Sequence, residues 1–385
     1  MDITIFPRTL QGSLRIIPSK SQAHRYLICA ALGSKECTIL CPETNQDIDA
    51  TADCLQALGA EIFRSPEGFQ VTPIRNKPAK AMLNCQESGS TLRFLLPLAG
   101  ALGIETTFKM EGRLPNRPLS PLWEEMERMG CSLSRPTDET ILCTGKLRSG
   151  QYFIDGSVSS QYITGLLFAT SVLGNSNLTV TGEIESKPYI DMTKKAMALF
   201  SQIPTPDTVT VEGDWSNGAF WLAANQLGSH IHIDGLEPNS PQGDRTAGTL
   251  IPALTTHQII SAKDIPDLVP ILSVVAAIHQ GATFTDIRRL RLKESDRVAS
   301  TIAMLEALGG KAAATEDTLT IFPARFHGGI VDACNDHRIA MAAAIAATAA
   351  AEPVTILGAH CVKKSYPGFW DEYSKLGGSY EQHLR

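Results

Sequence analysis

The chain has 385 residues, 43% of them apolar and 19% charged, a composition that excludes an intrinsically disordered protein. Because a single hydrophobic core rarely serves so long a chain, we expect two domains. The formal net charge of −6 disfavours nucleic-acid binding, which normally requires a basic domain, and makes any local cluster of Lys and Arg an exception that needs explaining.

The nine cysteines are scattered, odd in number and without a C-x-x-C pair, which argues against a disulfide framework and against a zinc site. The N-terminus opens on a strand-like run at 3–5 rather than on the basic and apolar segments of a signal peptide. The longest apolar run, 339–351, is rich in alanine and too short to span a membrane. These features predict a soluble cytoplasmic protein.

Two patterns recur along the chain. Apolar helices that follow a polar turn are expected at 22–32, 91–102, 160–173, 216–227, 266–279 and 338–350. In the second pattern an amphipathic helix ends in Leu-Gly or Met-Gly before a strand, at Gly59, Gly130, Gly309 and Gly377. Each of these glycines stands where the end of a helix needs a left-handed residue.

Together the two patterns predict six repeated units of helices and short strands. Two copies of the helix–glycine–strand signal are degraded, one near 200–208, where Ile203 and Pro204 replace it, and one near 246–262, which lacks the glycine. We expect these two units to keep their helices but to lose strands or hairpins. A solenoid is the alternative arrangement, but units of this length favour two globular domains of three units each.

The first candidate site lies at 18–25, where a helix begins. Lys20 precedes the helix, Ser21 is the expected N-cap, and Arg25 lies one turn in on the face of Ser21. Free backbone N–H groups, the positive end of the helix dipole and two cations would converge there, which suits a phosphate group. An ordinary capped helix with solvated basic side chains is the alternative.

Four further segments of the first half carry donors suited to a small anion. The alternatives are a plain turn at 87–93, a solvated loop at 113–118 and simple N-capping at 157–161. Segment 87–93 has a small-residue turn in which Gly89 would let a ligand approach the backbone. Segment 113–118 is a proline-flanked loop with Arg117, as a rigid oxyanion clamp would need. Neutral hydroxyls and an amide follow at 157–161, and 186–191 adds a hydroxyl, an ammonium and a phenol beside a fixed turn.

In the second half, the densest cluster of charge lies at 288–297. The alternation of Arg289, Arg291 and Lys293 predicts one face of a strand, with Ser295 capping the helix that follows. Lys293 and Glu294 could form a proton-transfer pair in which each shifts the pKa of the other. A salt-bridged surface is the alternative.

Three other segments complete the polar candidates of this half, at 265–267, 335–338 and 363–365. Asp267 begins an apolar helix and taken singly would most often be an N-cap, while His337, flanked by Asp and Arg, is more often a structural hydrogen-bonding residue than a base. No metal pattern, Walker loop or dinucleotide-binding fingerprint occurs in the sequence. We therefore expect chemistry without metal or cofactor, carried out by side chains on small anionic substrates.

Ten short motifs resemble, in order along the chain, those of the 5-enolpyruvylshikimate-3-phosphate synthases of the enolpyruvyl transferase family. Each motif alone is weak, but ten in the family's order are highly specific. They lie at 18–25, 88–93, 114–118, 157–161, 186–191, 211–214, 265–267, 292–297, 335–338 and 364–367.

The resemblance implies an α/β (α+β) fold, an inside-out barrel of two domains built from six βαβαββ-type repeats with two of them truncated. It implies that the chain crosses twice between the domains, so that 1–14 join 213–385 in a lower domain on the phosphoenolpyruvate side. Residues 15–212 would form an upper domain on the shikimate 3-phosphate side. Substrates would bind in a cleft between the domains that closes around them.

The resemblance also implies the reaction and the residues that serve it. The carboxyvinyl group of phosphoenolpyruvate would pass to the 5-hydroxyl of shikimate 3-phosphate through a tetrahedral intermediate, releasing phosphate, in the shikimate pathway to chorismate and the aromatic amino acids. Asp267 would accept the hydroxyl proton, Glu294 would transfer a proton at the methylene carbon, and Lys20 is a further acid/base candidate. We expect a monomer that needs no cofactor.

Two sets of residues would hold the substrates. Shikimate 3-phosphate would contact Lys20, Ser21, Arg25, Ser159, Ser160, Gln161, Ser186, Tyr189, Asp267, Arg289 and Lys293. Phosphoenolpyruvate would contact Lys20, Gly89, Arg117, Gln161, Arg297, Arg338 and Lys364.

The chain departs from the family pattern at several places. It is shorter than typical members, Glu87 stands where many members have Asn, Phe94 stands where a proline is common, and Arg289 stands where some members have an Asn that contacts the shikimate phosphate. Glyphosate inhibition is expected of the family, but the changes beside Gly89 make its potency unpredictable.

Two alternatives to this assignment can be stated. The nearest is the sister enzyme that transfers enolpyruvyl to UDP-N-acetylglucosamine, which normally carries a cysteine in the loop at 111–118; the loop here has none. The other is a non-catalytic anion-binding relative whose truncated repeats have abolished turnover, although every expected catalytic position is filled.

Overall fold

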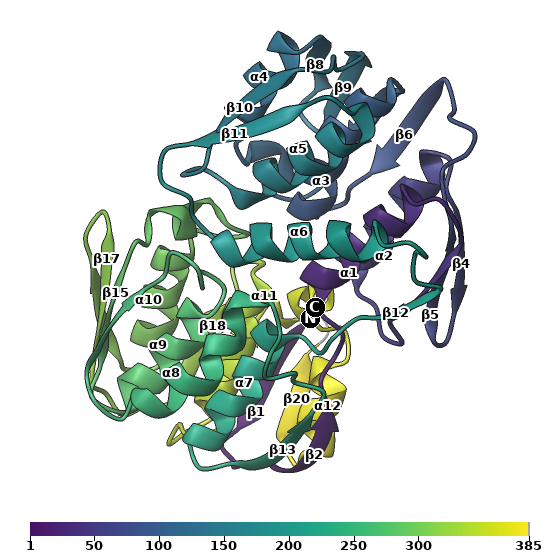
Figure 1. Cartoon of the computed structure of the whole chain (residues 1–385). Coiled ribbons are helices and arrows are strands. Elements are labelled where there is room, and N and C mark those ends of the chain that lie inside the picture. Colours follow the sequence, from purple (N-terminus) through teal and green to yellow (C-terminus); the bar gives the residue numbers. More distant parts are fainter. Residues whose placement is uncertain (384–385) are drawn as a thin grey trace. The chain divides into compact units, whose positions relative to one another are not determined.

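The computed structural model describes residues 1–383, which form two compact units of mixed helices and sheets (Figure 1). The central unit is Pro18–Val211, and the split unit combines Met1–Ile17 with Glu212–Arg385. Each unit has its own apolar core. The predicted α/β fold class is thereby confirmed.

The central unit is built around three largely apolar helices, α1 (Lys20–Ala31), α3 (Gly89–Leu102) and α5 (Ser160–Leu173). Helices α3 and α5 pack closely because Gly165 faces the backbone carbonyl of Arg93, where a Cβ would lie 2.2 Å from the oxygen. The other helices of this unit are α2 (Gln46–Ala57), η1 (Leu114–Asn116), α4 (Leu122–Arg128) and α6 (Lys187–Phe200).

The split unit has a corresponding set of apolar helices, α7 (Trp215–Gln226), α9 (Val269–Ile278) and α11 (His337–Ala347). These three pack against one another, and every residue of α11 is buried because its alanine-rich sequence allows close approach on all sides. The remaining helices are η2 (Gly243–Thr246), α8 (Ala247–Ala253), η3 (Arg288–Leu292), α10 (Arg297–Ala307), η4 (Ala359–Lys364) and α12 (Phe369–Lys375).

Three sheets cover the helices of the central unit. The first has the strand order β12 (Thr208–Thr210), β3 (Cys37–Leu40), β5 (Gly68–Thr72) and β4 (Glu61–Ser65). The second runs β6 (Lys80–Asn84), β7 (Glu105–Lys109), β9 (Thr140–Gly145) and β8 (Cys131–Thr137). The third has two strands, β10 (Gln151–Asp155) and β11 (Asn177–Thr181).

The split unit also has three sheets. One has the order β18 (Gly329–Asp332), β19 (Val354–Leu357), β1 (Asp2–Phe6) and β20 (Ser379–His383). Another runs β14 (Gln258–Ser261), β15 (Ala282–Thr285), β17 (Thr318–Phe322) and β16 (Lys311–Ala314). The third pairs β13 (His230–Asp234) with β2 (Gln11–Arg15).

Each of the six sheets within 1–383 contains one parallel pair of strands. The four-stranded sheets begin with a parallel pair, such as β6 with β7 or β14 with β15, and continue with two antiparallel strands. The two-stranded sheets consist of the parallel pair alone. After α6 and after α8 the chain passes directly to a strand of the next sheet, so the antiparallel hairpin is the part that these units lack. The predicted loss of strands or hairpins near 200–208 and 246–262 is confirmed, and the structure shows that the hairpin is the part lost.

Glycines end four of the helices as the repeat predicts. Gly59, Gly130, Gly309 and Gly377 all have positive φ and follow α2, α4, α10 and α12 directly before a strand. At Gly309 the restriction is also steric, since a Cβ would lie 2.2 Å from the ring of His327. No described helix has the length and apolar content that crossing a membrane would require.

Two predictions of helix caps are wrong, and one capping alternative is excluded. Helix α1 begins at Lys20, so the cap position is Ser19 rather than Ser21. The residue before α9 is Leu268, so Asp267 is not the N-cap that it would most often be if taken singly. Asp296, not Ser295, caps α10 by accepting from the backbone N–H of Ala299. These assignments differ because several polar residues adjoin each helix start, and tertiary contacts select among them.

The predicted strand at 289–293 is instead the 3₁₀ helix η3. A strand would place Leu290 and Leu292 on one buried face, but Leu290 is 1% exposed and Leu292 is 46% exposed. The turn therefore buries one leucine and leaves the other outside.

Candidate active site

The charged cluster of the split unit is organised around Arg297, the first residue of α10, which is 1% exposed. Its guanidinium donates to three carboxylates: Nη1 lies 2.6 Å from Asp267 Oδ1, Nη2 lies 2.6 Å from Glu294 Oε2, and Nε lies 2.8 Å from Asp336 Oδ2. Burial acts to lower the pKa of Arg297, but these three carboxylates raise it well above its usual value. Arg297 is therefore a permanent cation.

Asp267 precedes α9 and is surrounded by positive charge. Besides Arg297, Lys293 Nζ lies 3.5 Å from its Oδ1 and Arg338 Nη2 lies 3.7 Å from its Oδ2. Burial would raise the pKa of Asp267, yet the three cations hold it well below its usual range. The carboxylate is thus ionised at neutral pH and can accept a proton only weakly while all three cations face it.

Lys293 is partly buried beside this carboxylate. Burial lowers the pKa of its ammonium, and the charges of Arg297 and Arg289 act in the same direction, whereas Asp267 and Glu294 oppose the shift. A lysine with a lowered pKa releases a proton more readily than a solvated one. The predicted pairing of Lys293 with Glu294 in proton transfer stays a prediction.

Asp336 is a fully buried carboxylate that joins two helices. As the N-cap of α11 its Oδ1 accepts from the backbone N–H of Arg338 at 2.9 Å. Its Oδ2 accepts from Ser295 Oγ at 2.9 Å and from Arg297 Nε at 2.8 Å. Sequence reasoning did not assign it a role, although an Asp directly before an apolar helix was the available signal.

Arg338 and Lys364 add two more buried cations. Arg338 is 2% exposed and lies 5.9 Å from the centre of the Phe220 ring. Its Nε and Nη1 atoms are buried and have no hydrogen-bond partner among 1–383. Lys364 Nζ donates to the backbone carbonyl of Asn335 at 2.9 Å. A desolvated guanidinium with unused donors is suited to bind a carboxylate or phosphate.

A second residue that sequence reasoning missed in this unit is Asp244, which is 1% exposed in η2. It accepts a short hydrogen bond from Ser216 Oγ on α7. Burial and the negative charge of Asp267 raise the pKa of Asp244 to about 7, although Ser216 and Arg338 partly oppose the shift. This carboxyl group titrates near neutral pH, whereas Asp267 stays ionised.

In the central unit, the segment 18–25 at the start of α1 carries two cations that have different kinds of partner. Lys20 Nζ forms an ion pair with Asp47 Oδ2 at 2.9 Å. Arg25 is 3% exposed and donates to the neutral oxygens of Thr193 at 2.8 Å, Ser21 at 2.6 Å and Tyr189 at 3.0 Å. Burial lowers the pKa of Arg25 to about 10.

Gln161 of α5 is oriented by a residue that the sequence analysis did not assign, Arg93 of α3. Arg93 Nη1 donates to Gln161 Oε1 at 3.0 Å, and its Nη2 donates to the carbonyl of Pro118 at 3.1 Å. The Gln161 amide then donates from Nε2 to Ser90 Oγ at 3.0 Å. These contacts connect the segments 88–93, 114–118 and 157–161 that were predicted separately.

Gly89 and Arg117 meet at the same place. A Cβ on Gly89 would lie 2.6 Å from Arg93 Nη1 and 2.8 Å from Arg117 Nη1, so only glycine leaves both guanidiniums in position. Ser88 caps α3 by accepting from the backbone N–H of Thr91 at 3.2 Å. The first turn of α3 therefore adjoins two cations, an arrangement that favours an anion.

The remaining predicted residues divide between these two clusters. Ser159 caps α5 by accepting from the N–H of Gln161, Ser160 begins that helix, and Ser186 stands before α6 with a φ of 54°. Tyr189 contributes its carbonyl to Arg25, and Arg289 lies half-buried on η3 near Lys293. The central unit thus gathers Lys20, Ser21, Arg25, Gly89, Arg117, Ser159, Ser160, Gln161, Ser186 and Tyr189, and the split unit gathers Asp267, Arg289, Lys293, Glu294, Arg297, Arg338 and Lys364.

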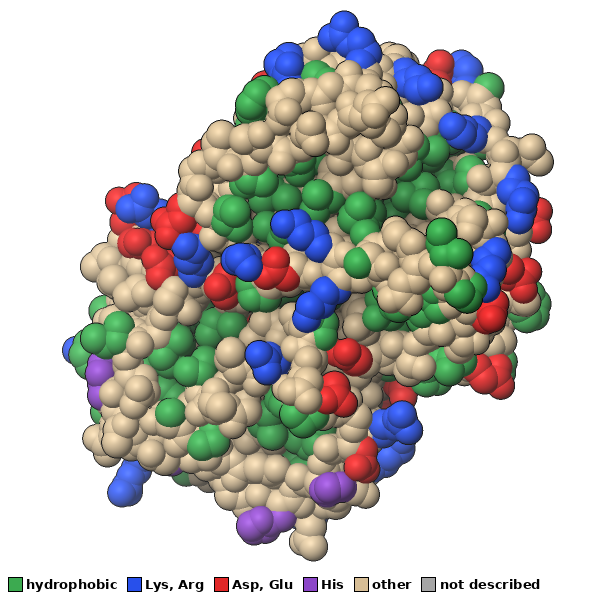
Figure 2. Space-filling model, viewed as in Figure 1, with side chains coloured by type: hydrophobic (Ala, Val, Ile, Leu, Met, Phe, Trp, Pro, Cys, Tyr) green, Lys and Arg blue, Asp and Glu red, His purple; other side chains and the backbone are tan. Residues whose placement is uncertain are grey.

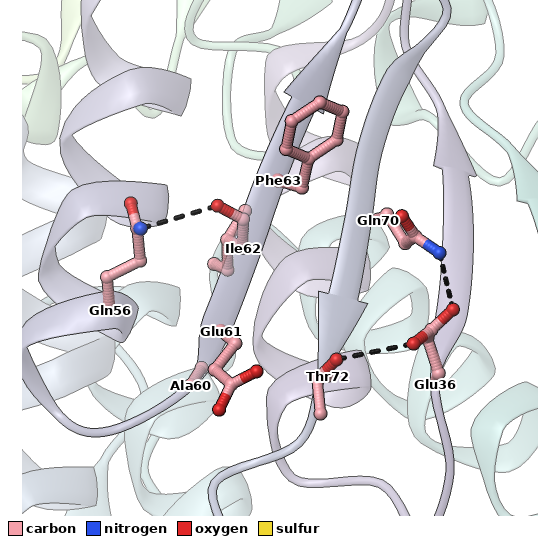
Figure 3. A pocket seen from close by; sticks show the side chains of 8 residues that line it. All are labelled: Glu36, Gln56, Ala60, Glu61, Ile62, Phe63, Gln70 and Thr72. Atoms are coloured by element: carbon pink, nitrogen blue, oxygen red, sulfur yellow. Dashed lines mark hydrogen bonds between the residues drawn. The ribbon is translucent and has the colours of Figure 1, made fainter.

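A surface groove of about 580 Å³ on the β4–β5 hairpin is distinct from both clusters (Figure 3). Glu36 accepts from Gln70 and Thr72 on one side of it, and Gln56 donates to the carbonyl of Ile62 on the other. No predicted site residue lines it. The face drawn in Figure 2 likewise shows basic and acidic side chains interspersed rather than one continuous basic field.

Comparison with known proteins matches almost the entire chain to one family. The family model described as EPSP synthase (3-phosphoshikimate 1-carboxyvinyltransferase) matches 6–373. A curated relative from Clostridium kluyveri with the name 3-phosphoshikimate 1-carboxyvinyltransferase is 37% identical, covering 99% of this chain and 98% of its own. A relative of the same name from Clostridium acetobutylicum is also 37% identical, covering 98% and 97%.

Solved structures show the same fold at lower sequence identity. The EPSP synthase of Acinetobacter baumannii superposes with a TM-score of 0.79 at 19% identity, covering 99% of this chain and 100% of its own. The enolpyruvyl transferase NikO of Streptomyces tendae superposes with a TM-score of 0.71 at 17% identity, covering 100% and 99%. Because both superpositions cover at least 99% of each chain, the two shortened units are accommodated within the common fold.

Proposed function

The chain belongs to the EPSP synthase (3-phosphoshikimate 1-carboxyvinyltransferase) family, and we propose that the two clusters described above carry the family's reaction. It is an enzyme of the shikimate pathway that transfers the enolpyruvyl group of phosphoenolpyruvate to the 5-hydroxyl of shikimate 3-phosphate and releases phosphate. The observation that carries the residue assignment is the convergence of Lys293, Arg297 and Arg338 on Asp267.

In the addition step, the oxygen of the 5-hydroxyl forms a bond to C2 of phosphoenolpyruvate while its proton goes to Asp267. A proton is added to the methylene carbon, through Glu294, to give a methyl group. The product is a tetrahedral ketal phosphate. In the elimination step a methyl proton returns to Glu294, the C2–O bond to phosphate breaks, and the departing phosphate takes up the proton held by Asp267. Both carboxyl groups are thereby restored, and atoms and charges balance over the two steps.

The low pKa of Asp267 bears directly on its role as the base. A carboxylate facing three cations is a poor proton acceptor, so its basicity must rise when substrates bind. The carboxylate and phosphate of phosphoenolpyruvate supply the negative charge for this change, because they compete for Arg297, Arg338 and Lys364. Binding of the donor would thereby activate the base that deprotonates the acceptor.

The central unit supplies the sites for phosphate. Arg25 has buried donors and neutral hydrogen-bond partners, and with Ser21, Ser159, Ser160, Gln161, Ser186 and Tyr189 it would hold shikimate 3-phosphate. Lys20, Gly89, Gln161 and Arg117 would contribute to phosphoenolpyruvate. These assignments are supported by the hydrogen bonds that join the three predicted segments through Arg93. We further propose that the protein acts as a cytoplasmic monomer.

Phosphate release tests the function. The protein should release phosphate from phosphoenolpyruvate when shikimate 3-phosphate is the acceptor, and release none above background with UDP-N-acetylglucosamine. No release with shikimate 3-phosphate would overturn the proposal, and release with the nucleotide sugar instead would transfer the assignment to the sister activity.

A further inference from the structure

A buried chain of hydrogen bonds links the first three helices of the central unit. His24 of α1 has its Nδ1 atom 2.7 Å from Thr51 Oγ1 of α2, and that oxygen lies 2.7 Å from Thr91 Oγ1 of α3. Thr91 Oγ1 in turn donates to Ser88 Oγ at 2.7 Å. All four side chains are 0% exposed. Buried polar groups in such a network are costly unless every partner is in place, so the chain fixes the positions of the helices that carry it.

The donor and the acceptor in each hydrogen bond of this chain follow from the number of hydroxyl protons available. The hydroxyl of Thr91 has two acceptors, Ser88 Oγ at 2.7 Å and the carbonyl oxygen of Asp47 at 3.5 Å, so its one proton is used in either case. The Thr91 oxygen must then accept from Thr51, and the Thr51 oxygen must accept from His24. His24 therefore carries its proton on Nδ1.

The other ring nitrogen of His24 agrees with this tautomer. Nε2 is buried without a hydrogen-bond partner among 1–383, and the ring meets Phe94 edge-on with 6.2 Å between centroids. Burial, together with the charges of Lys20 and Arg25, holds the pKa of His24 well below its usual value. The imidazole is therefore neutral and donates a single hydrogen bond, to Thr51.

The Ser88 end of the chain, and a branch from Thr91, lie at groups assigned to phosphoenolpyruvate. Ser88 caps α3, whose first residues are Gly89 and Ser90. Thr91 Oγ1 also lies 3.5 Å from the carbonyl of Asp47, the residue whose carboxylate holds Lys20. A change at His24 would thus alter the position of the first turn of α3 relative to Lys20.

We propose that His24 is a positioning residue, which acts through Thr51 and Thr91 to fix the first turn of α3 against the N-terminus of α1 for binding of phosphoenolpyruvate. The identity of the ligand rests on the proposed function, whereas the hydrogen-bond chain does not. The two parts can therefore fail separately.

Steady-state kinetics with both substrates varied test the positioning role. His24→Phe, which keeps a ring but removes the donor, should raise KM for phosphoenolpyruvate by about tenfold or more and change KM for shikimate 3-phosphate by less than about twofold. His24→Asn, whose amide can donate from the position of Nδ1, should restore KM to within about threefold of wild type. An unchanged KM for phosphoenolpyruvate in His24→Phe, or an equal rise in both KM values, overturns the proposal.

Thr51→Val gives a second test should His24→Phe fail to fold. It is nearly isosteric, interrupts the chain at its middle, and should reproduce the selective rise in KM. Thr106→Val is the matched control, because Thr106 is equally buried in the same unit but donates to the carbonyl of Ile104 outside the chain. A Thr51→Val enzyme that behaves like Thr106→Val overturns the proposal.

The tautomer is tested without any turnover. In protein labelled with ¹⁵N-histidine, the ring signals that disappear in His24→Asn should show the proton on Nδ1 in the wild type. A proton on Nε2 would reverse the chain and overturn the inference. If wild-type protein lacks turnover with shikimate 3-phosphate but shows the Nδ1–H form, the proposed function fails and the hydrogen-bond chain stands.

Discussion

Arg297 in the split unit and Arg25 in the central unit are both buried arginines near the start of a helix, yet their surroundings are opposite. Arg297 contacts three carboxylates, and its pKa is raised well above the usual value. Arg25 contacts hydroxyl and carbonyl oxygens, and burial lowers its pKa to about 10. Its positive charge is solvated by dipoles but not neutralised.

This difference assigns different tasks to the two regions. The region around Arg25 holds a buried positive charge that an incoming anion can neutralise, which suits tight binding of a phosphate. The region around Arg297 is already balanced by acids, so an anion must displace a carboxylate there. Displacement raises the basicity of that carboxylate, which suits proton transfer. The central unit is therefore expected to dominate binding and the split unit to dominate chemistry.

The largest expected effect is on turnover in the split unit. Lys293→Ala should lower kcat/KM by on the order of a thousandfold, because it removes a partly buried cation beside Asp267 that is assigned to shikimate 3-phosphate. The fold should persist, since Asp267 keeps its bond to Arg297. Lys363→Ala, at an exposed neighbour of Lys364, is the control and should leave turnover unchanged. Phosphate release and circular dichroism measure the two properties, and near wild-type turnover in Lys293→Ala would contradict the site.

The second largest expected effect is on the free energy of unfolding, and it compares the two arginines directly. Arg297→Met leaves the buried Asp336 and its neighbours without their cation and should lower the free energy of unfolding by at least about 3 kcal/mol. Arg25→Met leaves only neutral oxygens unpaired and should lower it by about 1–2 kcal/mol. Urea unfolding followed by circular dichroism provides both values. Equal losses in the two variants would remove the basis of the comparison.

The buried carboxyl group of Asp244 in the split unit predicts that stability depends on pH. The pKa of Asp244 is about 7 in the folded protein against 3.8 for the free side chain, so between about pH 4 and 7 the native state binds a proton that the unfolded state has lost. This group therefore makes the free energy of unfolding fall as pH rises through that window and stay low above pH 7. Asp244→Asn removes the effect and keeps an acceptor for Ser216.

The measurement compares Asp244→Asn with wild type by urea unfolding at pH 5 and pH 8. The variant should gain about 2.5–3 kcal/mol relative to wild type between the two values, because two pH units separate pH 5 from the pKa of about 7. Asp138→Asn, at an exposed residue of the β8–β9 turn, is the control and should show no such gain. A constant difference between Asp244→Asn and wild type would mean that Asp244 does not titrate in this window.

The sequence predicted the helices well because their signals are local. Gly59, Gly130, Gly309 and Gly377 end helices for a steric reason that needs no tertiary contact. The loss of this signal near 200–208 and 246–262 also marked the two units that lack hairpins. The lost signal did not show that the missing part is the antiparallel pair of strands, because strand pairing depends on contacts between segments distant in the chain.

The contacts within the clusters could not be predicted in the same way. Asp336 and Asp244 act through partners that are distant in the chain, Arg297 and Ser216, so their burial follows only from the packed structure. The positions of caps at Ser19 and Asp296 were missed because neighbouring polar residues have similar propensities. Motif order proposed the residues of the site, and tertiary structure decided how their charges are balanced.

The smallest expected effect probes the unbalanced charge of Arg25 with inorganic phosphate alone. For a dissociation constant of about 10 mM, 100 mM phosphate stabilises the wild type by about 1.4 kcal/mol, and Arg25→Met should lose this gain. Arg297→Met should retain it, because Arg297 already contacts three carboxylates and contributes little to the capture of a free anion. Thermal unfolding with and without phosphate, at constant ionic strength set with chloride, measures the difference. If Arg297→Met loses the gain and Arg25→Met keeps it, the anion-capturing region is the split unit, and the division of tasks between the two arginines is the reverse of that proposed.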